Sequence, residues 1–415
     1  MHKKINAILI PILMAALIAA FFLLPQKTFS ERENRYLATA PKLSWNNIKS
    51  GRFMEEISDY VSDHFPFRDL WIGINSNVSR LKGKTLINGV YFADDKYLIE
   101  KYESAGNMKK IATAVNSFAE KVEAKVTFMA VPTSVVINEE KLPDGAMERV
   151  WLDGEGNIYS KPFGSGILVA CSPQEADIKI LYSNLTCKTV PLVGTLLEAN
   201  RRGTNEDGAD QMFYRQDHHW TSKAAMLAYE EYYYVSRNLS KDFSPRVFKY
   251  DIELVSKTFR GTLFNKVGEC DLGYDVIYAP KLPEGTIVYE TEEGVFDTIY
   301  DETKLETADQ YAYFLSGNHP FVTITNTANE DLTVRDQWGN EVVVRHYPDI
   351  VIIKDSYANC MVPFMVGDYH TITIIDPRYY GDVISAYVNE TKADEVLFVY
   401  NMNTLGTDSG IRRVQ

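Results

Sequence analysis

The stretch Ile350-Val351-Ile352-Ile353-Lys354-Asp355-Ser356-Tyr357 decides the fold that we expect for this chain of 415 residues. Four consecutive aliphatic residues without a polar interruption are typical of a strand that is covered on both faces, as in a parallel sheet. A helix-like run begins at Tyr357, so Ser356 falls at a strand-to-helix turn. In open α/β sheets such turns lie at the carboxyl edge of the sheet, where ligands bind.

Strand-like and helix-like segments alternate on both sides of this stretch, which predicts an α/β domain with a covered parallel sheet. We expect strands at 125–131, 211–214, 371–375 and 396–400 and helices at 107–122, 191–202, 221–234 and near 383. The α/β domain would consist of two parts, at 86–245 and 346–415. Between them, 246–345 contains short alternating segments and is expected to be a β-rich insertion or lid, with strands at 247–254, 286–289, 311–315 and 321–324.

The N-terminus carries Lys3 and Lys4 before a run from Ile5 to Leu24 that has no charged residue. About 20 apolar residues suffice to cross a bilayer, so residues 1–25 are expected to form a transmembrane helix, a signal anchor with the lysines in the cytoplasm. A signal peptide cleaved near Ala19-Ala20 is the alternative. Both interpretations place the bulk of the chain outside the cytoplasm. Residues 26–85 would form a tether and two amphipathic helices that pack on the domain.

The composition excludes some classes of function. A net charge of −13 argues against a nucleic-acid-binding protein, because such a protein needs a basic face. The four cysteines, Cys171, Cys187, Cys270 and Cys360, have no CxxC spacing, which disfavours a redox motif or a zinc site. Cys171 and Cys187 are either buried thiols or a local disulfide. The chain also lacks a Walker loop, a GxGxxG motif and a GxSxG elbow, so no cofactor is expected.

Asp217-His218-His219-Trp220-Thr221 supplies a carboxylate and two imidazoles in consecutive positions. Residues i and i+2 of an extended segment share a face, so the Asp217 carboxylate can orient the imidazole of His219. Ser356 is the candidate nucleophile, and the helix N-terminus beside it would stabilise negative charge. The structural alternatives are that Asp217 is a turn residue, that the histidines are structural and that Ser356 only caps a helix.

Further candidates surround this constellation. Asn401 follows the strand at 396–400 and is a candidate oxyanion donor, with turn formation as the alternative. Asn318 and His319 are substrate-binding candidates from a lid, together with His218, Trp220 and Tyr357. A metal site formed by Asp217, His218 and His219 is disfavoured, because three adjacent ligands do not converge easily on one ion.

The motifs taken together resemble the bacterial DHHW protein family. The resemblance rests on the Asp217-His218-His219-Trp220 and Asp355-Ser356 segments, on Asn401 and its strand, and on three further motifs: Glu31-Arg32-Glu33-Asn34-Arg35, Asp63-His64-Phe65-Pro66-Phe67-Arg68-Asp69 and Gly317-Asn318-His319-Pro320. The stretch Val150–Thr189 departs from the family pattern, and the serine lacks the glycine of a Gly-Asp-Ser block.

The resemblance implies a three-layer fold like that of the SGNH hydrolases, in a circularly permuted motif order, and a relation to proteins that O-acetylate alginate. It implies Ser356 as nucleophile, His219 as base, Asp217 as its orienter and Asn401 as oxyanion donor. The expected function is that of a cell-surface, serine-dependent O-acetyltransferase or acetylesterase acting on an envelope polysaccharide or exopolysaccharide, with a membrane-bound O-acyltransferase as acetyl donor. The alternative is a non-catalytic glycan-binding or scaffold protein of a polysaccharide-modification complex.

Overall fold

The computed structural model describes residues 2–30, 35–154, 157–161, 168–203, 209–268, 272–335, 337–338 and 341–414. Residues 31–34, which carry most of one family motif, and Cys270 lie outside the described residues. Cys171, Cys187 and Cys360 are free thiols, so the possible disulfide between Cys171 and Cys187 is not formed.

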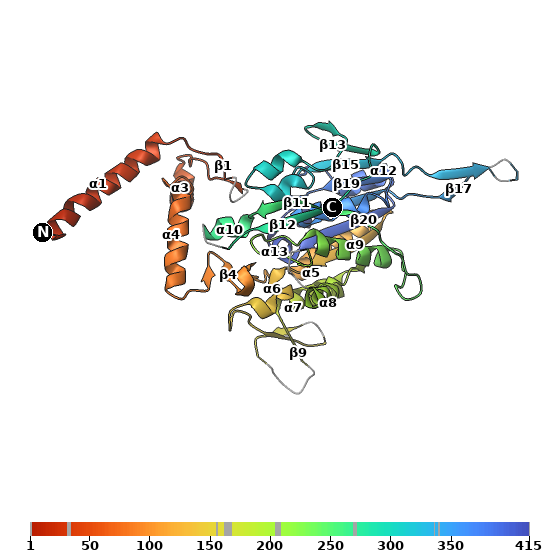
Figure 1. Cartoon of the computed structure of the whole chain (residues 1–415), viewed down its shortest axis with the longest axis horizontal. Helices are drawn as coiled ribbons and strands as arrows, with labels where there is room; N and C mark the ends of the chain where they lie inside the picture. The colour runs from red at the N-terminus through yellow and green to blue at the C-terminus, as the bar shows by residue number, and fades with distance from the viewer. Residues whose placement is uncertain are drawn as a thin grey trace.

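An eight-stranded sheet forms the centre of the molecule (Figure 1). Its strands, in spatial order, are β10 (Lys188–Thr189), β6 (Lys125–Val131), β20 (Glu395–Asn401), β18 (Ile350–Lys354), β19 (Thr371–Ile375), β15 (Phe321–Asn326), β13 (Ile287–Thr291) and β14 (Gly294–Phe296). From β10 to β19 all neighbours are parallel, whereas β15, β13 and β14 add to the edge in antiparallel pairs. The predicted parallel sheet is therefore correct.

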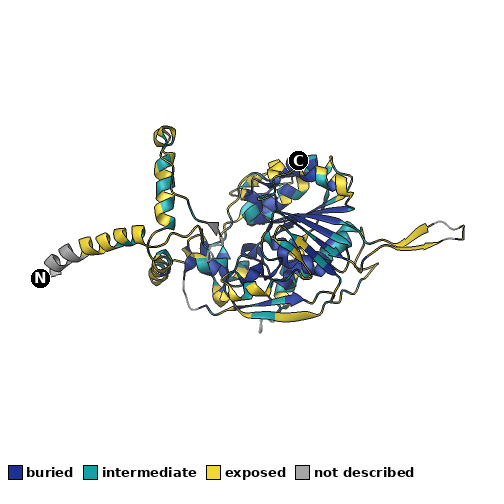
Figure 2. Cartoon of the chain, turned by 90° about the horizontal axis from the view of Figure 1, so that it is seen from above, coloured by how far each residue is buried: buried dark blue, intermediate teal, exposed yellow. Residues whose placement is uncertain are grey.

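The side chains of β18 alternate between two cores. Ile350 and Ile352 pack in one core, with α8 (Leu192–Arg202), α9 (Ser222–Ser236) and α11 (Val362–Met365). Val351 and Ile353 pack in the other, with α5 (Met108–Ala119), α7 (Pro173–Asn184), α12 (Ile384–Thr391) and α13 (Met402–Thr407). Figure 2 shows the strands in dark blue between these helices. The molecule thus has three layers, and β18 carries aliphatic residues throughout because neither of its faces meets water.

The region 246–345 is only partly separate from the sheet. Strands β13, β14 and β15 extend the central sheet, whereas β11 (Ile252–Phe259) pairs with β12 (Asp275–Pro280), and β16 (Leu332–Arg335) pairs with β17 (Glu341–Arg345). The β16–β17 hairpin projects from the domain and is exposed along its length (Figures 1 and 2). The boundaries predicted for the domains remain predictions.

Two predicted strands are wrong, and a third, predicted at 247–254, begins only at Ile252 in β11. The stretch 311–315 begins with a 3-10 helix, η4 (Gln310–Tyr313), because the Ala312 amide bonds back to Asp309 and Leu315 has a positive φ of 59°. The stretch 211–214 makes one bridge, between Phe213 and Trp220, because the chain reverses at once through the turn that contains the histidines. Thr221 caps α9 as predicted.

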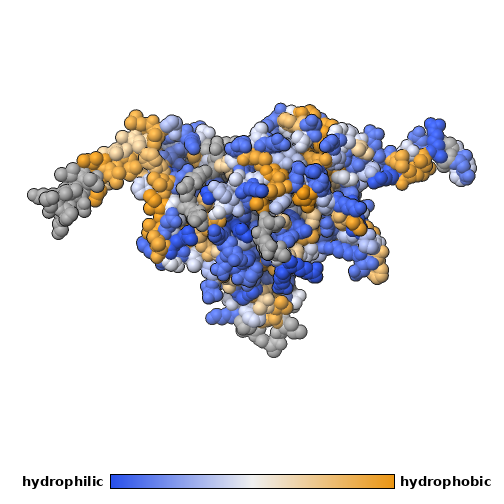
Figure 3. Space-filling view, in the orientation of Figure 1, coloured by the Kyte–Doolittle hydropathy of each residue, from blue (hydrophilic) through white to orange (hydrophobic). Residues whose placement is uncertain are grey.

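The N-terminal region forms an arm of helices, α1 (His2–Leu23), α3 (Arg52–Asp63) and α4 (Arg68–Leu81) (Figure 1). In the described part of the chain no helix is long and apolar enough to cross a membrane, so the transmembrane helix predicted at 1–25 is not supported. The predicted packing on the domain is correct for α4, because its Gly73 is buried against Gly268, where an added Cβ atom would lie 2.6 Å from the Gly73 Cα atom. It is wrong for α3, which has no buried residue. Figure 3 shows apolar surface along this arm.

Candidate active site

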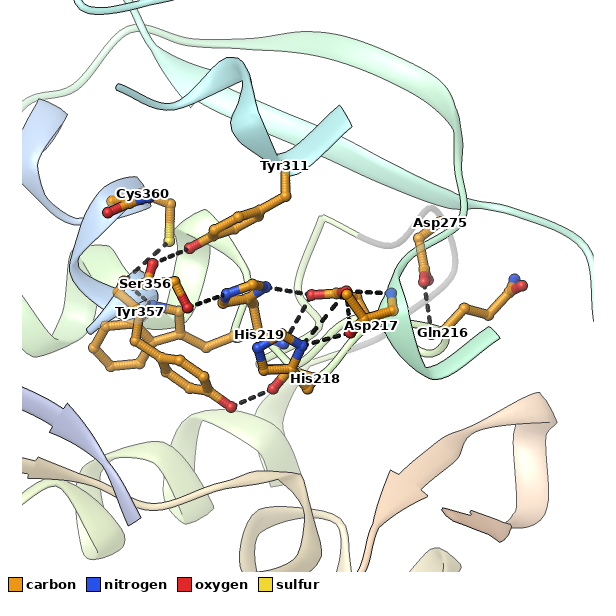
Figure 4. A network of polar contacts seen from close by, with 12 residues as sticks. Gln216, Asp217, His218, His219, Asp275, Tyr311, Ser356, Tyr357 and Cys360 are labelled. Carbon is orange, nitrogen blue, oxygen red and sulfur yellow. Dashed lines mark hydrogen bonds and ion pairs between the residues drawn. The ribbon is translucent and has the colours of Figure 1, made fainter. Parts of the chain in front are cut away.

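Asp217 and His219 form a bonded pair in the turn before α9 (Figure 4). The Asp217 Oδ1 atom lies 2.5 Å from Nδ1 of His219 and accepts a hydrogen bond of 2.9 Å from the His219 amide. The carboxylate thereby fixes the ring of His219, which leaves its Nε2 atom to face Ser356. The two residues share a face, as the i and i+2 spacing predicted.

The second carboxylate oxygen of Asp217 is held by a residue 45 positions further along the chain. Thr262, the first residue of α10 (Thr262–Val267), donates to Oδ2 from its amide at 2.7 Å and from its hydroxyl at 3.0 Å. Gly261 permits this approach, because a Cβ atom at that position would lie 2.1 Å from Oδ2. Neither residue was predicted, since no local pattern in the sequence links α10 to the turn.

Ser356 lies at the carboxyl end of β18, where its place in the sequence predicted it. Asp355 caps the 3-10 helix η5 (Ser356–Cys360) by accepting from the Tyr357 amide, and this turns the chain so that the Ser356 hydroxyl faces the histidine. The Oγ atom of Ser356 is 2.7 Å from Nε2 of His219. Asp217, His219 and Ser356 thus form one continuous chain of hydrogen bonds (Figure 4).

Tyr311 covers the ring of His219. The two rings are stacked with centroids 3.7 Å apart and planes inclined by 9°. The Tyr311 hydroxyl donates to the backbone oxygen of Ser356 at 3.1 Å, so one side chain contacts both the histidine and the serine. Tyr311 comes from η4, the segment that the sequence pattern predicted as a strand.

Burial and charge set the protonation of the pair. Burial, together with the positive field of His218, lowers the pKa of His219 to about 4, and the Asp217 carboxylate offsets only part of this shift. Burial also tends to raise the pKa of Asp217, but the two imidazoles and the hydrogen bonds outweigh it and hold this pKa well below its usual range. At neutral pH the pair is therefore a carboxylate and a neutral imidazole, the form that accepts a proton.

A cavity of about 620 Å³ opens at this site. Ser356, His219, Tyr311, His218 and Asn318 are among the residues that line it. Of the five predicted substrate-binding residues, His218 and Asn318 therefore reach the cavity. The other three, Trp220, Tyr357 and His319, are buried and do not line it. The Trp220 indole donates to the Tyr357 carbonyl at 2.8 Å, which is a structural role.

Asn401 does not fit the predicted role of oxyanion donor. Its Nδ2 group donates to Asp355 at 2.7 Å and to the Thr404 hydroxyl at 2.8 Å, and its Oδ1 caps α13. Both amide hydrogens are thus used within the fold. Asn318, Asn359 and Asn403 are the asparagines that line the cavity. Asn318 Oδ1 accepts from Lys354 Nζ at 2.9 Å, which turns its NH₂ group away from the lysine.

Asp217, His218 and His219 bring one potential metal-binding atom each to within 4.8 Å of one another, so three adjacent ligands do converge, contrary to the prediction. Hydrogen bonds already occupy most of these atoms, because Asp217 binds His219 and Thr262, and His218 Nδ1 lies 2.6 Å from the Thr262 hydroxyl. These hydrogen bonds hold the three side chains in an arrangement that orients His219.

The fold matches several solved structures. A DHHW family protein from Eubacterium siraeum matches with a TM-score of 0.56 and 20% identity, over 79% of this chain and 95% of that chain. PatB1 of Bacillus cereus, solved with a sulfonyl adduct, matches with a TM-score of 0.55 and 17% identity, over 79% and 98%. The O-acetyltransferase domain of Pseudomonas putida AlgJ is more distant, with a TM-score of 0.41 and 13% identity over 77% of this chain and 93% of that domain.

No protein-family model matches the sequence, and no curated protein matches it either. At identities of 20% and below, the structural matches establish the fold. The motifs predicted a resemblance to the DHHW family, and the fold confirms it: the chain has the fold of a DHHW family protein.

Proposed function

We propose that this chain is a serine-dependent O-acyltransferase or esterase that acts on an envelope polysaccharide, with Ser356, His219 and Asp217 as its catalytic residues. The observation that carries the proposal is the spacing of 2.7 Å between Ser356 Oγ and His219 Nε2 in a ring already oriented by Asp217. A serine within hydrogen-bond reach of a base that is held by a third group is the arrangement that activates a nucleophile.

The chemistry follows from the positions of the three side chains. His219 Nε2 takes the hydroxyl proton of Ser356 as Oγ attacks the carbonyl carbon of an acetyl ester. The tetrahedral intermediate collapses, the donor alcohol leaves with the proton from His219, and an acetyl ester remains on Ser356. A sugar hydroxyl or water then gives its proton to His219 and attacks this ester. As the second tetrahedral intermediate collapses, His219 returns the proton to Ser356 Oγ, and the acetylated sugar, or acetate where water attacks, is released.

Asn318 is our candidate for stabilising the oxyanion in both steps. Its side chain lines the same cavity as Ser356, and Lys354 fixes its orientation through Oδ1. Burial lowers the pKa of Lys354 to about 8, with Asp376 offsetting part of the shift, so the lysine remains mostly charged at neutral pH. A pre-oriented amide donor gains strength in such a site because it need not reorganise during the reaction.

The apolar run at the N-terminus predicts export of the chain, and acetyl-CoA is not available outside the cytoplasm. We therefore extend the proposal to an extracytoplasmic enzyme that receives acetyl groups through a membrane-bound O-acyltransferase. The sulfonyl adduct in the PatB1 structure provides a suitable reagent for testing the serine of this chain. A scaffold role would be favoured by a serine remote from the histidine or sealed from solvent, and neither condition applies to Ser356 and His219.

The test is release of acetate from a chromogenic acetyl ester by the purified chain, with and without added polysaccharide. We expect ester cleavage by the wild type and loss of it in Ser356→Ala and His219→Ala. Thr113→Ala, an exposed change on α5, is the control. Equal cleavage by the wild type and Ser356→Ala would refute the proposal.

A further inference from the structure

A second cavity adjoins the candidate active site. It also has a volume of about 620 Å³, and both cavities are lined by Lys101 and Glu103. These two side chains form an ion pair of 2.7 Å on the boundary between the cavities. The second cavity extends from this boundary to the first residues of α7, Pro173 and Gln174. Space of this extent beside Ser356 exceeds what a small acetyl ester needs and suits a polymer.

Two tyrosines give the second cavity fixed aromatic walls. The Tyr102 hydroxyl donates to Asp177 at 2.5 Å, and the Tyr91 hydroxyl donates to the Ala146 carbonyl at 3.2 Å. Both rings line the cavity while their polar ends are engaged elsewhere. An aromatic side chain that is already held in place can bind the apolar face of a sugar ring at little entropic cost.

The charges of the two cavities are unbalanced. Among the described residues, the Lys and Arg side chains that line them are Lys101, Lys266 and Arg378. Each of these cations is already paired with a carboxylate, that of Glu103, Glu100 and Asp376 respectively. No lining cation in the described chain is therefore left to neutralise an acidic ligand.

Carboxylates remain in excess. Asp144 and Glu148 are exposed on the wall of the second cavity, and in the described part of the chain neither belongs to an ion pair. An acidic polymer in this groove would place its charges against like charges, which costs binding energy.

We infer that the two cavities form one groove for the acceptor and that the acceptor is a glycan without acidic groups. This inference rests on the proposed function and specifies its substrate class. The glycan would run from Ser356, past the Lys101–Glu103 pair, to the start of α7, with several sugars bound on the side away from the serine.

The experiment measures binding of two hexasaccharides of equal length by calorimetry, one of N-acetylglucosamine and one of a uronic acid. It uses the full chain, and binding is read without any reaction. We expect the neutral oligomer to bind the wild type at least about tenfold more tightly. The double variant Asp144→Lys/Glu148→Lys should reduce this preference. The control Glu120→Lys/Glu390→Lys makes the same change in net charge at exposed sites outside the groove and should not alter it.

A second variant tests the extent of the groove. Ser104→Trp places a large side chain at an exposed position of the second cavity, so it should weaken binding of the hexasaccharide and leave binding of a disaccharide unchanged. Equal binding of the acidic and neutral oligomers, or no effect of Ser104→Trp, would overturn the inference, as would a failure of both glycans to bind. Cleavage of the acetyl ester in the same preparations tests the proposed function separately, because it requires Ser356 but not the second cavity.

Discussion

The aromatic ring of Tyr311 lies flat on the imidazole of His219, with ring centroids 3.7 Å apart and planes 9° apart. During the proposed reaction His219 becomes positively charged while it holds the serine proton. The π face of a tyrosine attracts such a cation, and a desolvated contact of this kind stabilises it by about 2 kcal/mol. Tyr311 is therefore expected to stabilise the charged form of His219 as well as to position it.

Replacing Tyr311 tests this contact. Tyr311→Phe keeps the ring and removes the hydroxyl, with its hydrogen bonds to the Ser356 backbone and to Cys360, so kcat/KM for an acetyl ester should fall less than about tenfold. Tyr311→Leu removes the stacked face, and we expect a loss of roughly tenfold or more together with a lower kinetic pKa of His219. Tyr313→Leu is the control, because Tyr313 stacks on Tyr300 instead. If Tyr311→Leu had the same rate and pH profile as the wild type, the contact would have no role in the reaction.

Gly261 should tolerate no side chain. In Gly261→Ala the new Cβ atom would lie 2.1 Å from the Asp217 carboxylate, which must then move and release His219. We expect kcat for ester cleavage to fall by roughly 10²-fold or more, as when the orienting carboxylate of a triad is lost. Gly194→Ala is the matched control, since nothing lies within 4 Å of its added Cβ. Comparing kcat with the melting temperature of both variants separates a loss of orientation from unfolding, and an unchanged kcat in Gly261→Ala would contradict this account.

The pH dependence follows from the lowered pKa of His219. The base must be neutral to accept the serine proton, so kcat/KM should be constant near neutral pH and fall as the pH drops through about 4. His218→Gln removes the positive neighbour that contributes to the low pKa, so the midpoint of this fall should move to higher pH. A pH–rate profile of both proteins measures the shift, with His346→Gln, an exposed change, as control. A midpoint that moves down or stays in place would show that His218 does not act through charge.

Asn318 and Asn401 should differ in their effects. Asn318→Ala removes the amide proposed to stabilise the oxyanion, and we expect kcat to fall by about 10²-fold to 10³-fold with little change in stability. Asn401→Ala removes the N-cap of α13 and should lower the free energy of unfolding by roughly 0.5–2 kcal/mol. Steady-state kinetics and thermal unfolding of the two variants provide the comparison. If kcat per folded molecule fell in Asn401→Ala but not in Asn318→Ala, Asn401 and not Asn318 would be the oxyanion donor.

The sequence predicted those features that depend on local patterns. The aliphatic run of β18 identified a strand buried on both faces, and β19 was predicted with the bounds that the structure has, Thr371–Ile375. The spacing of Asp217 and His219 predicted their shared face, and the turn after β18 predicted the position of Ser356. These predictions succeed because strand periodicity and edge position are properties of adjacent residues.

The remaining features depend on contacts between distant segments. Thr262 reaches Asp217 across 45 residues, and Tyr311 reaches His219 from a segment whose aromatic composition favours a strand. Asn401 occupies the end of a strand as predicted, but Asp355 on the neighbouring strand β18 captures its amide. Hydrogen-bond competition of this kind cannot be read from a sequence, because it depends on which groups the fold brings within reach.

The most direct test of the central claim is covalent trapping of Ser356. The chain is incubated with a sulfonyl fluoride at neutral pH, and the site of any adduct is located by mass spectrometry after proteolysis. We predict a single adduct on Ser356, formed much more slowly in His219→Ala and Gly261→Ala and at the normal rate in Gly194→Ala. A folded protein that forms no adduct on Ser356, or one that reacts equally well without His219, would contradict an activated serine at this site.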